Sequence, residues 1–284
     1  MNVLIFGVTG MLGSAMIRVL SESSDLAVYG TARCENSRRY FSDKLSKHVI
    51  SGIDVENHDS LVSAFAAVQP DVVVNCVGLV KQLALAKDPL HAVPINSLLP
   101  HRLAGLCQTS RARLVHFSTD CVFSGSTGNY SETDLPDPSD LYGRSKLLGE
   151  VDYPHAITIR TSIIGHELTG CKSLINWFLA QQGSVKGFTQ AIYSGLPTVE
   201  LATVVRDWIL PRIDLHGVYH VASNPINKFD LLRLVAKEYD KSIEIIPSED
   251  VIINRSLNSN RFKEATGYMP PEWPVLVRRM HDFK

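Results

Sequence analysis

NVLIFGVTGMLG, residues 2–13, is the stretch that decides the fold of this chain. Its first five residues form a short apolar run that is typical of a buried strand. Three glycines follow, and the next segment, SAMIRVL (residues 14–20), has its apolar residues at helical spacing. We therefore predict a strand, a glycine-rich turn and a helix, which is the setting that a dinucleotide-phosphate site requires.

Each glycine of this turn has its own expected role. Gly7 would permit the tight turn, Gly10 would let a pyrophosphate approach the backbone, and Gly13 would let the helix pack closely on the strand. The start of the helix, at Met11 and Leu12, would offer unsatisfied N–H groups to the phosphates. The spacing is G-x-x-G-x-x-G rather than the commoner G-x-G-x-x-G.

The rest of the chain repeats the alternation of strands and helices, which predicts an α/β fold with a doubly wound parallel (Rossmann) sheet. Pro94 and Pro100 interrupt the longest helical segment, so we expect that helix to start near Pro94 and to be distorted at Pro100. The other strands are predicted at residues 26–31, 48–53, 72–77, 114–117, 156–159, 217–222 and 243–246, and the helices at residues 59–68, 88–106, 141 onward, 173–182, 199–209 and 229–239.

After Gly165 the regular alternation weakens. Residues 185–197 read as a turn-rich segment without regular structure. We predict an NAD(P)-binding Rossmann domain over residues 1–164, to which residues 199–236 return. A smaller C-terminal substrate lobe would be built from residues 165–198 and 237–284.

The pentapeptide YGRSK, residues 142–146, is the main candidate for chemistry. On a helix, Tyr142 and Lys146 would stand at i and i+4 on one face. An ammonium roughly 4 Å away could lower the phenol pKa from about 10 by up to about three units. Such a phenol is a usable general acid or base. The alternative is a solvated pair on a surface helix.

Two further groups of polar residues follow predicted strands. Ser118, Thr119 and Asp120 come after the strand at 114–117, at the sheet edge where ligands of open α/β sheets bind; a helix or turn cap is the alternative. Arg33 follows the second strand, where an acidic residue would bind a free ribose 2′-hydroxyl. An arginine suits a 2′-phosphate better, so we predict NADP(H), with NAD(H) as the alternative.

Composition limits the other classes of function. The 284 residues carry a formal net charge of -1, which gives no electrostatic case for binding nucleic acid or an anionic membrane. We find neither a signal peptide nor an apolar run long enough to span a bilayer. The five cysteines are scattered, which argues for a reducing compartment and against a disulfide framework. We therefore expect a cytoplasmic protein.

Together these motifs resemble a known family, the extended short-chain dehydrogenase/reductases. The glycine turn, Ser118-Thr119-Asp120 and Tyr142-x-x-x-Lys146 occur in the order of that superfamily. Several segments look like the dTDP-4-dehydrorhamnose reductase subgroup, and the similarity spans essentially the whole chain. They are STDCVFSG (118–125), RTS (160–162), GLPT (195–198) and RSL (255–257).

The resemblance implies hydride transfer from NAD(P)H to the 4-keto group of a nucleotide-linked deoxysugar. Thr119 would hydrogen-bond the substrate carbonyl, Tyr142 would protonate the developing alkoxide, and Lys146 would hold the nicotinamide ribose and lower the tyrosine pKa. The remaining implied contacts are Asp54 and Asn75 with the cofactor, and Asp120, Phe123, Arg160, Tyr193 and Arg255 with the nucleotide sugar. Asn96 falls where the family has a helix asparagine, with a satisfied core amide as the alternative.

The sequence also departs from the subgroup. Ile163 and Ile164 stand where an aromatic side chain near the sugar is expected, which puts the identity of the sugar in question. Ala15 replaces a glutamate that helps some members to bind magnesium between subunits, so we predict no metal. A homodimer stays open, as do two alternative functions: a cofactor-retaining epimerase or dehydratase, and a non-catalytic cofactor-binding regulatory subunit.

Overall fold

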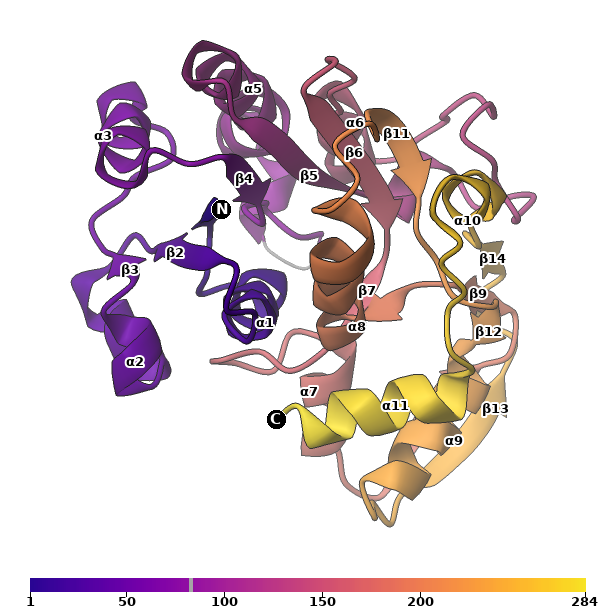
Figure 1. The fold of residues 1–284 in the computed structure, drawn as a ribbon. Coiled ribbons are helices and arrows are strands. Elements are labelled where there is room, and N and C mark those ends of the chain that lie inside the picture. Colours follow the sequence, from indigo (N-terminus) through magenta and orange to yellow (C-terminus); the bar gives the residue numbers. More distant parts are fainter. Residues whose placement is uncertain (82–83) are drawn as a thin grey trace.

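The computed structural model describes residues 1–81 and 84–284 and contains a seven-stranded sheet in the order β11-β6-β5-β4-β1-β2-β3. Every neighbouring pair in this sheet is parallel, which confirms the predicted doubly wound fold (Figure 1). Its strands are β1 (Asn2–Phe6), β2 (Ala27–Thr31), β3 (Val49–Ile50), β4 (Val72–Asn75), β5 (Arg113–Thr119), β6 (Ala156–Thr161) and β11 (Gly217–His220).

Two hydrophobic cores lie on opposite faces of this sheet, because successive strand residues point to opposite sides. Val3 and Ile5 of β1 pack into one core with helices α1 (Met11–Leu20) and α8 (Thr198–Val204). Leu4 and Phe6 pack into the other core with α3 (His58–Val68) and α5 (Leu99–Ser110). The continuous apolar runs of the sequence are therefore strands buried on both faces.

The long helical segment around Pro94 differs from its prediction. It begins at Pro89 rather than near Pro94, because the Asp88 side chain accepts a hydrogen bond from the Leu90 N–H and proline suits the first helical turn. After α4 (Pro89–Ala92) the chain forms a π-helix, η3 (Val93–Leu98), before α5. The predicted distortion thus lies just before Pro100, where the Leu99 N–H bonds five residues back to the Pro94 carbonyl.

Residues 184–197 form three short strands, so the expectation of an irregular segment is wrong. These strands are β8 (Ser184–Phe188), β9 (Ala191–Tyr193) and β10 (Leu196–Pro197). Each of them pairs with a segment that is distant in sequence, so the pairing leaves no local signal. The partners are β13 (Glu244–Ser248) for β8, β12 (Ile226–Asn227) and β14 (Ile253–Asn254) for β9, and β7 (Ile163–Ile164) for β10.

The late helices divide between the main sheet and these small sheets. Helix α8 packs on α1, whereas α9 (Lys228–Glu238) packs on β8, β13 and α11 (Trp273–Asp282). Helix α9 therefore lies with the small sheets, although residues up to 236 were predicted to return to the Rossmann part. The other helices are α2 (Asp43–Ser46), α6 (Leu141–Leu148), α7 (Leu174–Ala180) and α10 (Asn260–Thr266), with further η segments at Glu35–Tyr40, Ala84–Lys87, Asp120–Val122 (η4) and Val205–Ile209 (η5).

Among the described residues, no helix combines the length and apolar character needed to cross a bilayer.

Candidate active site

The turn after β1 has the geometry that its glycines predict. Gly7 has a φ of 84°, in the region that favours glycine, and a Cβ on Gly13 would overlap the carbonyl group of Gly7. Helix α1 therefore starts directly against the end of β1. Ser14 donates the first helical hydrogen bond, to the Gly10 carbonyl at 2.9 Å. The backbone N–H groups of Met11, Leu12 and Gly13 come before this first helical hydrogen bond. They lie at the positive end of the α1 dipole.

Gly10 is the N-cap of α1, and no side chain caps this helix. A Cβ on Gly10 would meet only the Gly7 carbonyl oxygen, at 3.4 Å, so the space beside it is open. The turn therefore offers backbone N–H groups and room for a phosphate, as the sequence predicts.

The arginines after β2 differ in their surroundings. Arg38 donates from Nε to the Val49 carbonyl at 3.0 Å, and Arg39 donates to the Tyr40 hydroxyl at 2.8 Å. Arg33 is exposed and lies two residues after the end of β2, at the carboxyl edge of the sheet. It is the arginine that is best placed to meet a 2′-phosphate.

The other two predicted cofactor residues make internal hydrogen bonds. Asp54 is exposed and accepts from the Glu56 N–H at 3.0 Å. Asn75 is buried at the end of β4, where its Oδ1 accepts from the Val77 N–H at 3.1 Å and its Nδ2 lies 3.2 Å from His116 Nδ1. Asn75 thus shapes the chain after β4, and its place near the cofactor ribose stays a prediction.

Helix α6, which carries Tyr142 and Lys146, is fixed against the end of β5. Asp140 caps it by accepting from the Gly143 N–H at 2.8 Å. Gly143 faces η4, and a Cβ there would overlap the Cys121 carbonyl. This close approach places α6 beside Thr119, the last residue of β5.

The π-helix η3 supports α6 from the other side. Asn96 is fully buried; its Nδ2 donates to Ser145 Oγ at 3.1 Å and to the Leu79 carbonyl at 3.2 Å, and its Oδ1 accepts from the Leu79 N–H. Ser97 Oγ donates to the Ser145 carbonyl at 2.8 Å. Asn96 is therefore a satisfied core amide that joins two elements of the site.

Lys146 reaches the end of β5 rather than the tyrosine. Its Nζ donates to the Phe117 carbonyl at 2.6 Å, two residues before Thr119. Burial lowers the pKa of Lys146 to about 8, and the carboxylate of Glu150 opposes this shift. The ammonium is thus held at the sheet edge by a backbone carbonyl.

The expectation that Lys146 lowers the pKa of Tyr142 is wrong. Burial raises the pKa of Tyr142, the nearby Cys121 raises it further, and hydrogen bonding to the Thr119 side chain opposes the rise. The phenol therefore stays protonated at neutral pH. A protonated phenol suits a proton donor, and the Thr119 hydroxyl lies beside it.

Thr119 and Asp120 form the polar end of β5. Both side chains are buried, and the Thr119 hydroxyl lies 3.2 Å from Asp120 Oδ1 while accepting from the Cys121 N–H at 3.1 Å. Burial raises the pKa of Asp120, and the charges of Arg255 and Lys228 oppose this rise. The structure therefore brings Thr119, Tyr142 and Lys146 to one edge of the sheet.

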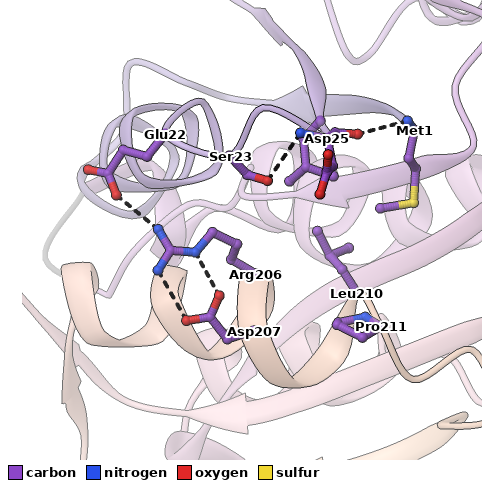
Figure 2. A pocket seen from close by; sticks show the side chains of 9 residues that line it. Met1, Glu22, Ser23, Asp25, Arg206, Asp207, Leu210 and Pro211 are labelled. Carbon is purple, nitrogen blue, oxygen red and sulfur yellow. Dashed lines mark hydrogen bonds and ion pairs between the residues drawn. The ribbon is translucent and has the colours of Figure 1, made fainter.

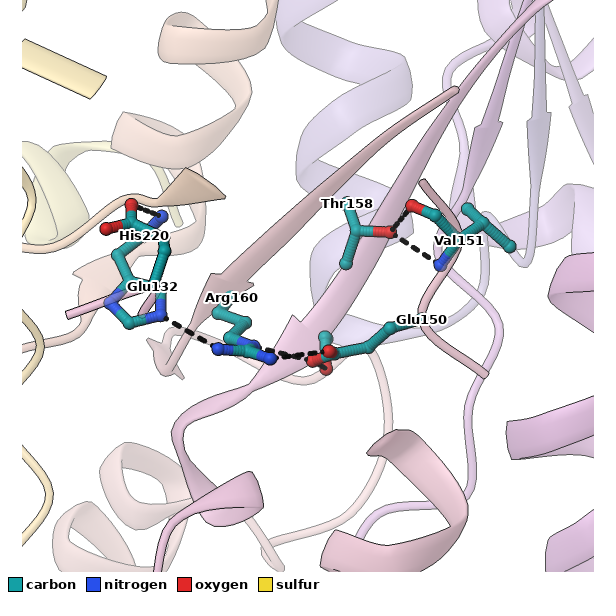
Figure 3. A network of polar contacts seen from close by, with 7 residues as sticks. Glu132, Glu150, Val151, Thr158, Arg160 and His220 are labelled. Carbon is teal, nitrogen blue, oxygen red and sulfur yellow. Dashed lines mark hydrogen bonds and ion pairs between the residues drawn. The ribbon is translucent and has the colours of Figure 1, made fainter. Parts of the chain in front are cut away.

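Two predicted substrate residues have other roles. Phe123 is fully buried and stacks on Tyr130, with ring centroids 4.2 Å apart. Arg160, also buried, forms two hydrogen bonds to Glu150, at 2.8 and 2.7 Å, and its Nη1 lies 3.3 Å from His220 Nε2 (Figure 3). These side chains hold the loop and strands behind the site, and their contact with substrate stays a prediction.

The remaining predicted substrate residues gather around Asp120. Arg255 and the buried Tyr193 both interact electrostatically with it, although they are far apart in sequence. The sequence analysis missed two neighbours, Cys121 and Lys228, which share this environment. No motif marks Lys228, because it approaches Asp120 only when the small sheets form.

A surface pocket elsewhere does not belong to this site. It has a volume of about 510 Å³ and lies where β1 and β2 begin, at the opposite edge of the sheet. Arg206 lines this pocket and already forms ion pairs, with Glu22 at 2.9 Å and with Asp207 at 2.7 Å (Figure 2). In residues 1–81 and 84–284 no group of three or more His, Cys, Asp or Glu side chains is arranged to hold a metal.

Comparison with known proteins gives relatives over the full chain. A probable low-salt glycan biosynthesis reductase, Agl14 of Haloferax volcanii, is 30% identical over 78% of this chain and 75% of its own length. The dTDP-4-dehydrorhamnose reductase of Escherichia coli is 26% identical over 99% of this chain and 97% of its own length. The mouse methionine adenosyltransferase 2 subunit beta is 31% identical over 52% of this chain and 41% of its own length.

Solved structures share the fold. A dTDP-4-dehydrorhamnose reductase from Bacillus anthracis in complex with NADP superposes with a TM-score of 0.79 at 20% identity, covering 100% of this chain and 98% of that chain. A Thermus thermophilus UDP-glucose 4-epimerase in complex with NAD gives 0.78 at 18% identity, with coverages of 100% and 98%. The model of the family described as "RmlD substrate binding domain" matches residues 1–282, and the chain belongs to that family.

Proposed function

We propose that this protein is an NADP(H)-dependent reductase acting on the 4-keto group of a nucleotide-linked deoxysugar, in the synthesis of a polysaccharide precursor. The observation that carries the proposal is the convergence of Thr119, Tyr142 and Lys146 at the carboxyl end of β5. Relatives named as reductases, covering most or all of the chain, support the same reaction.

The residues present fit a dinucleotide cofactor. A Cβ at Gly13 would overlap the Gly7 carbonyl group, so α1 starts close against β1, and the space beside Gly10 is open. The amides at the start of α1 would bind the pyrophosphate, and Arg33 would bind the 2′-phosphate. The nicotinamide supplies the hydride when it is bound.

Side chains of the protein would stabilise and then neutralise the negative charge that develops on the carbonyl oxygen. The Thr119 hydroxyl would turn its O–H from Asp120 Oδ1 to that oxygen, and Tyr142 would deliver the proton that converts the alkoxide to an alcohol. Lys146 would anchor the cofactor ribose while it keeps its bond to the Phe117 carbonyl. A phenol whose pKa is raised holds its proton until the alkoxide forms.

The two parts of the fold are proposed to bind different ligands. Residues 1–164 would bind the cofactor, and residues 165–198 and 237–284 would bind the nucleotide sugar. Helix α9 is better grouped with this second part, because it packs on β8 and β13.

Two other functions are less well supported. An epimerase or dehydratase has the same fold, but its cofactor is regenerated and not consumed. A regulatory subunit would need no proton donor, yet the Tyr142 phenol lies beside the Thr119 hydroxyl at the sheet edge. The similarity to the subunit beta covers only about half of this chain.

The test is to supply NADPH with a panel of keto-sugar nucleotides and to follow the absorbance of the reduced cofactor. We expect oxidation of NADPH with at least one 4-keto deoxysugar nucleotide, and weaker activity with NADH. Arg33→Ser should reduce the preference for NADPH by roughly 10-fold, since a charge-assisted contact is worth about 1.5–3 kcal/mol. Conversion of a sugar without loss of NADPH would contradict the reductase function.

A further inference from the structure

The small three-stranded sheet brings two cations to the same side of the site. Strand β9 lies at its centre, with β12 antiparallel on one side and β14 parallel on the other. Lys228 directly follows β12 and Arg255 directly follows β14. Because Asn227 and Asn254 both lie opposite Ile192, the residues after them flank the middle strand.

These cations surround one buried carboxylate. Asp120 interacts electrostatically with both Arg255 and Lys228. The neighbouring Cys121 interacts with Asp120 and Arg255. Arg255 also interacts with Asp137 and Asp140, whereas Asp120 is the carboxylate that opposes the lowered pKa of Lys228. The nearby Lys81 pairs with Asp140 at 2.7 Å.

The two cations are held differently. Arg255 donates from Nε to the Phe123 carbonyl at 2.9 Å, which fixes its guanidinium against the loop after β5. Lys228 is half-buried, and its ammonium makes no hydrogen bond or ion pair with any described residue. Burial lowers the pKa of Lys228, and Asp120 opposes that shift. The acceptors of this half-buried ammonium are therefore water or a bound group.

The position of Lys228 is also unfavourable for its own helix. It is the first residue of α9, where the positive end of the helix dipole disfavours a cation. A residue type that is unfavourable for its own secondary structure is often found at a functional position.

A second observation comes from Tyr193 in β9, which lies opposite Ile226 of β12. Its side chain is 7% exposed, and its hydroxyl has no hydrogen-bond partner among the described residues; Ser162 approaches it without completing a bond. An unpaired buried hydroxyl next to Asp120 marks this side of the site as one that accepts a polar ligand.

We infer that Lys228, supported by Arg255, is a substrate-binding residue that receives the diphosphate of the nucleotide sugar, an assignment that rests on the proposed function. A diphosphate supplies the negative charge and the oxygen acceptors that the Lys228 ammonium does not find among the described residues. The sugar would then lie between this cationic pair and the Thr119–Tyr142 pair.

The test measures binding without turnover, by titration calorimetry on the full chain saturated with NADP⁺. The probes are dTDP against thymidine, UDP against uridine, and inorganic pyrophosphate as the arm that carries no base. We expect each diphosphate to bind more tightly than its nucleoside. Lys228→Gln should weaken diphosphate binding by roughly 10- to 100-fold and leave nucleoside binding unchanged, while Lys228→Arg stays within a few-fold of wild type.

Lys237→Gln is the matched control, because it removes the same charge from an exposed position on the same helix. Equal affinities of diphosphate and nucleoside in the wild type, or a diphosphate affinity that Lys228→Gln leaves intact, would overturn the inference. If Lys228 only balances Asp120, then Lys228→Gln lowers the unfolding midpoint without changing the ratio of diphosphate to nucleoside affinity, which also overturns it. Because no turnover is needed, failure of the reductase assay would affect the proposed function alone.

Discussion

The sequence places Tyr142 and Lys146 correctly, but it does not predict the direction in which the pKa of the tyrosine shifts. The i, i+4 spacing and the polar strand end at Thr119 place these groups at one sheet edge. The direction in which the pKa of Tyr142 shifts depends on burial and on the nearby Cys121, and both of these result from tertiary packing. The lysine's first partner is a backbone carbonyl, and no side-chain pattern predicts it.

Replacing Tyr142 by phenylalanine tests the proton donor. Tyr142→Phe should lower kcat by about 10²–10⁴, the usual worth of a positioned acid, and leave cofactor affinity nearly unchanged. Steady-state rates and NADPH fluorescence titration measure the two quantities. Tyr153→Phe, at an exposed tyrosine, is the control and should change neither. Loss of NADPH affinity in Tyr142→Phe would show that this residue binds the cofactor and is not the acid.

The pKa of Lys146 predicts a pH dependence. Burial lowers this pKa to about 8, so the ammonium is charged below about pH 8 and becomes neutral as the pH rises through that value. Activity and cofactor affinity should therefore fall above about pH 8. Lys146→Arg should remove this fall, because a guanidinium stays charged over that range, and Lys146→Met should weaken both quantities at every pH. A flat wild-type profile between pH 7 and 9.5 would contradict this role.

At the scale of elements, the glycine turn was predictable because its requirements are local. A strand end, a positive φ and a close helix packing involve only residues 2–20. The strands β8, β9 and β10 were missed because their partners lie about 30 to 60 residues away. The internal contacts of Arg160 and Phe123 were also not predictable, since both depend on partners in other elements.

Gly13→Ala tests the contact between α1 and β1. A Cβ there would overlap the backbone of Gly7, so the helix must move away from the turn. We expect NADPH affinity to fall by at least about 10-fold and the free energy of unfolding to fall by about 1–3 kcal/mol. Gly105→Ala in α5 is the control, because its Cβ would meet nothing within 4 Å. That variant should be as stable as wild type or about 0.5–1 kcal/mol more stable.

The ion pair of Glu150 and Arg160 is predicted to be structural. Both side chains are less than 10% exposed, at 8% and 6%, so removing one charge leaves the other buried. Glu150→Gln should lower the free energy of unfolding by about 3–5 kcal/mol, measured by urea denaturation. The exposed Glu249→Gln is the control. If Glu150→Gln raised KM for the sugar nucleotide at unchanged stability, Arg160 would be a substrate residue after all.

At the scale of the whole molecule, the fold separates two tasks. The seven-stranded sheet presents the glycine turn, Arg33 and the end of β5 at one edge. The small sheets bring Tyr193, Lys228 and Arg255 to the same site from late in the chain. The sequence predicted the first part because repeated strand–helix units have a regular period. It could not place Lys228, whose position depends on a three-stranded sheet of non-consecutive segments.

If these groups reduce a keto sugar with NADPH, the stoichiometry of the reaction will show it. The purified chain would be incubated with a 4-keto deoxysugar nucleotide and excess NADPH, and both the oxidised cofactor and the sugar product would be quantified. We expect one NADPH to be oxidised for each 4-hydroxy product formed, and no product with Tyr142→Phe on the same timescale. Product formed without oxidation of NADPH, or formed equally fast by Tyr142→Phe, would contradict it.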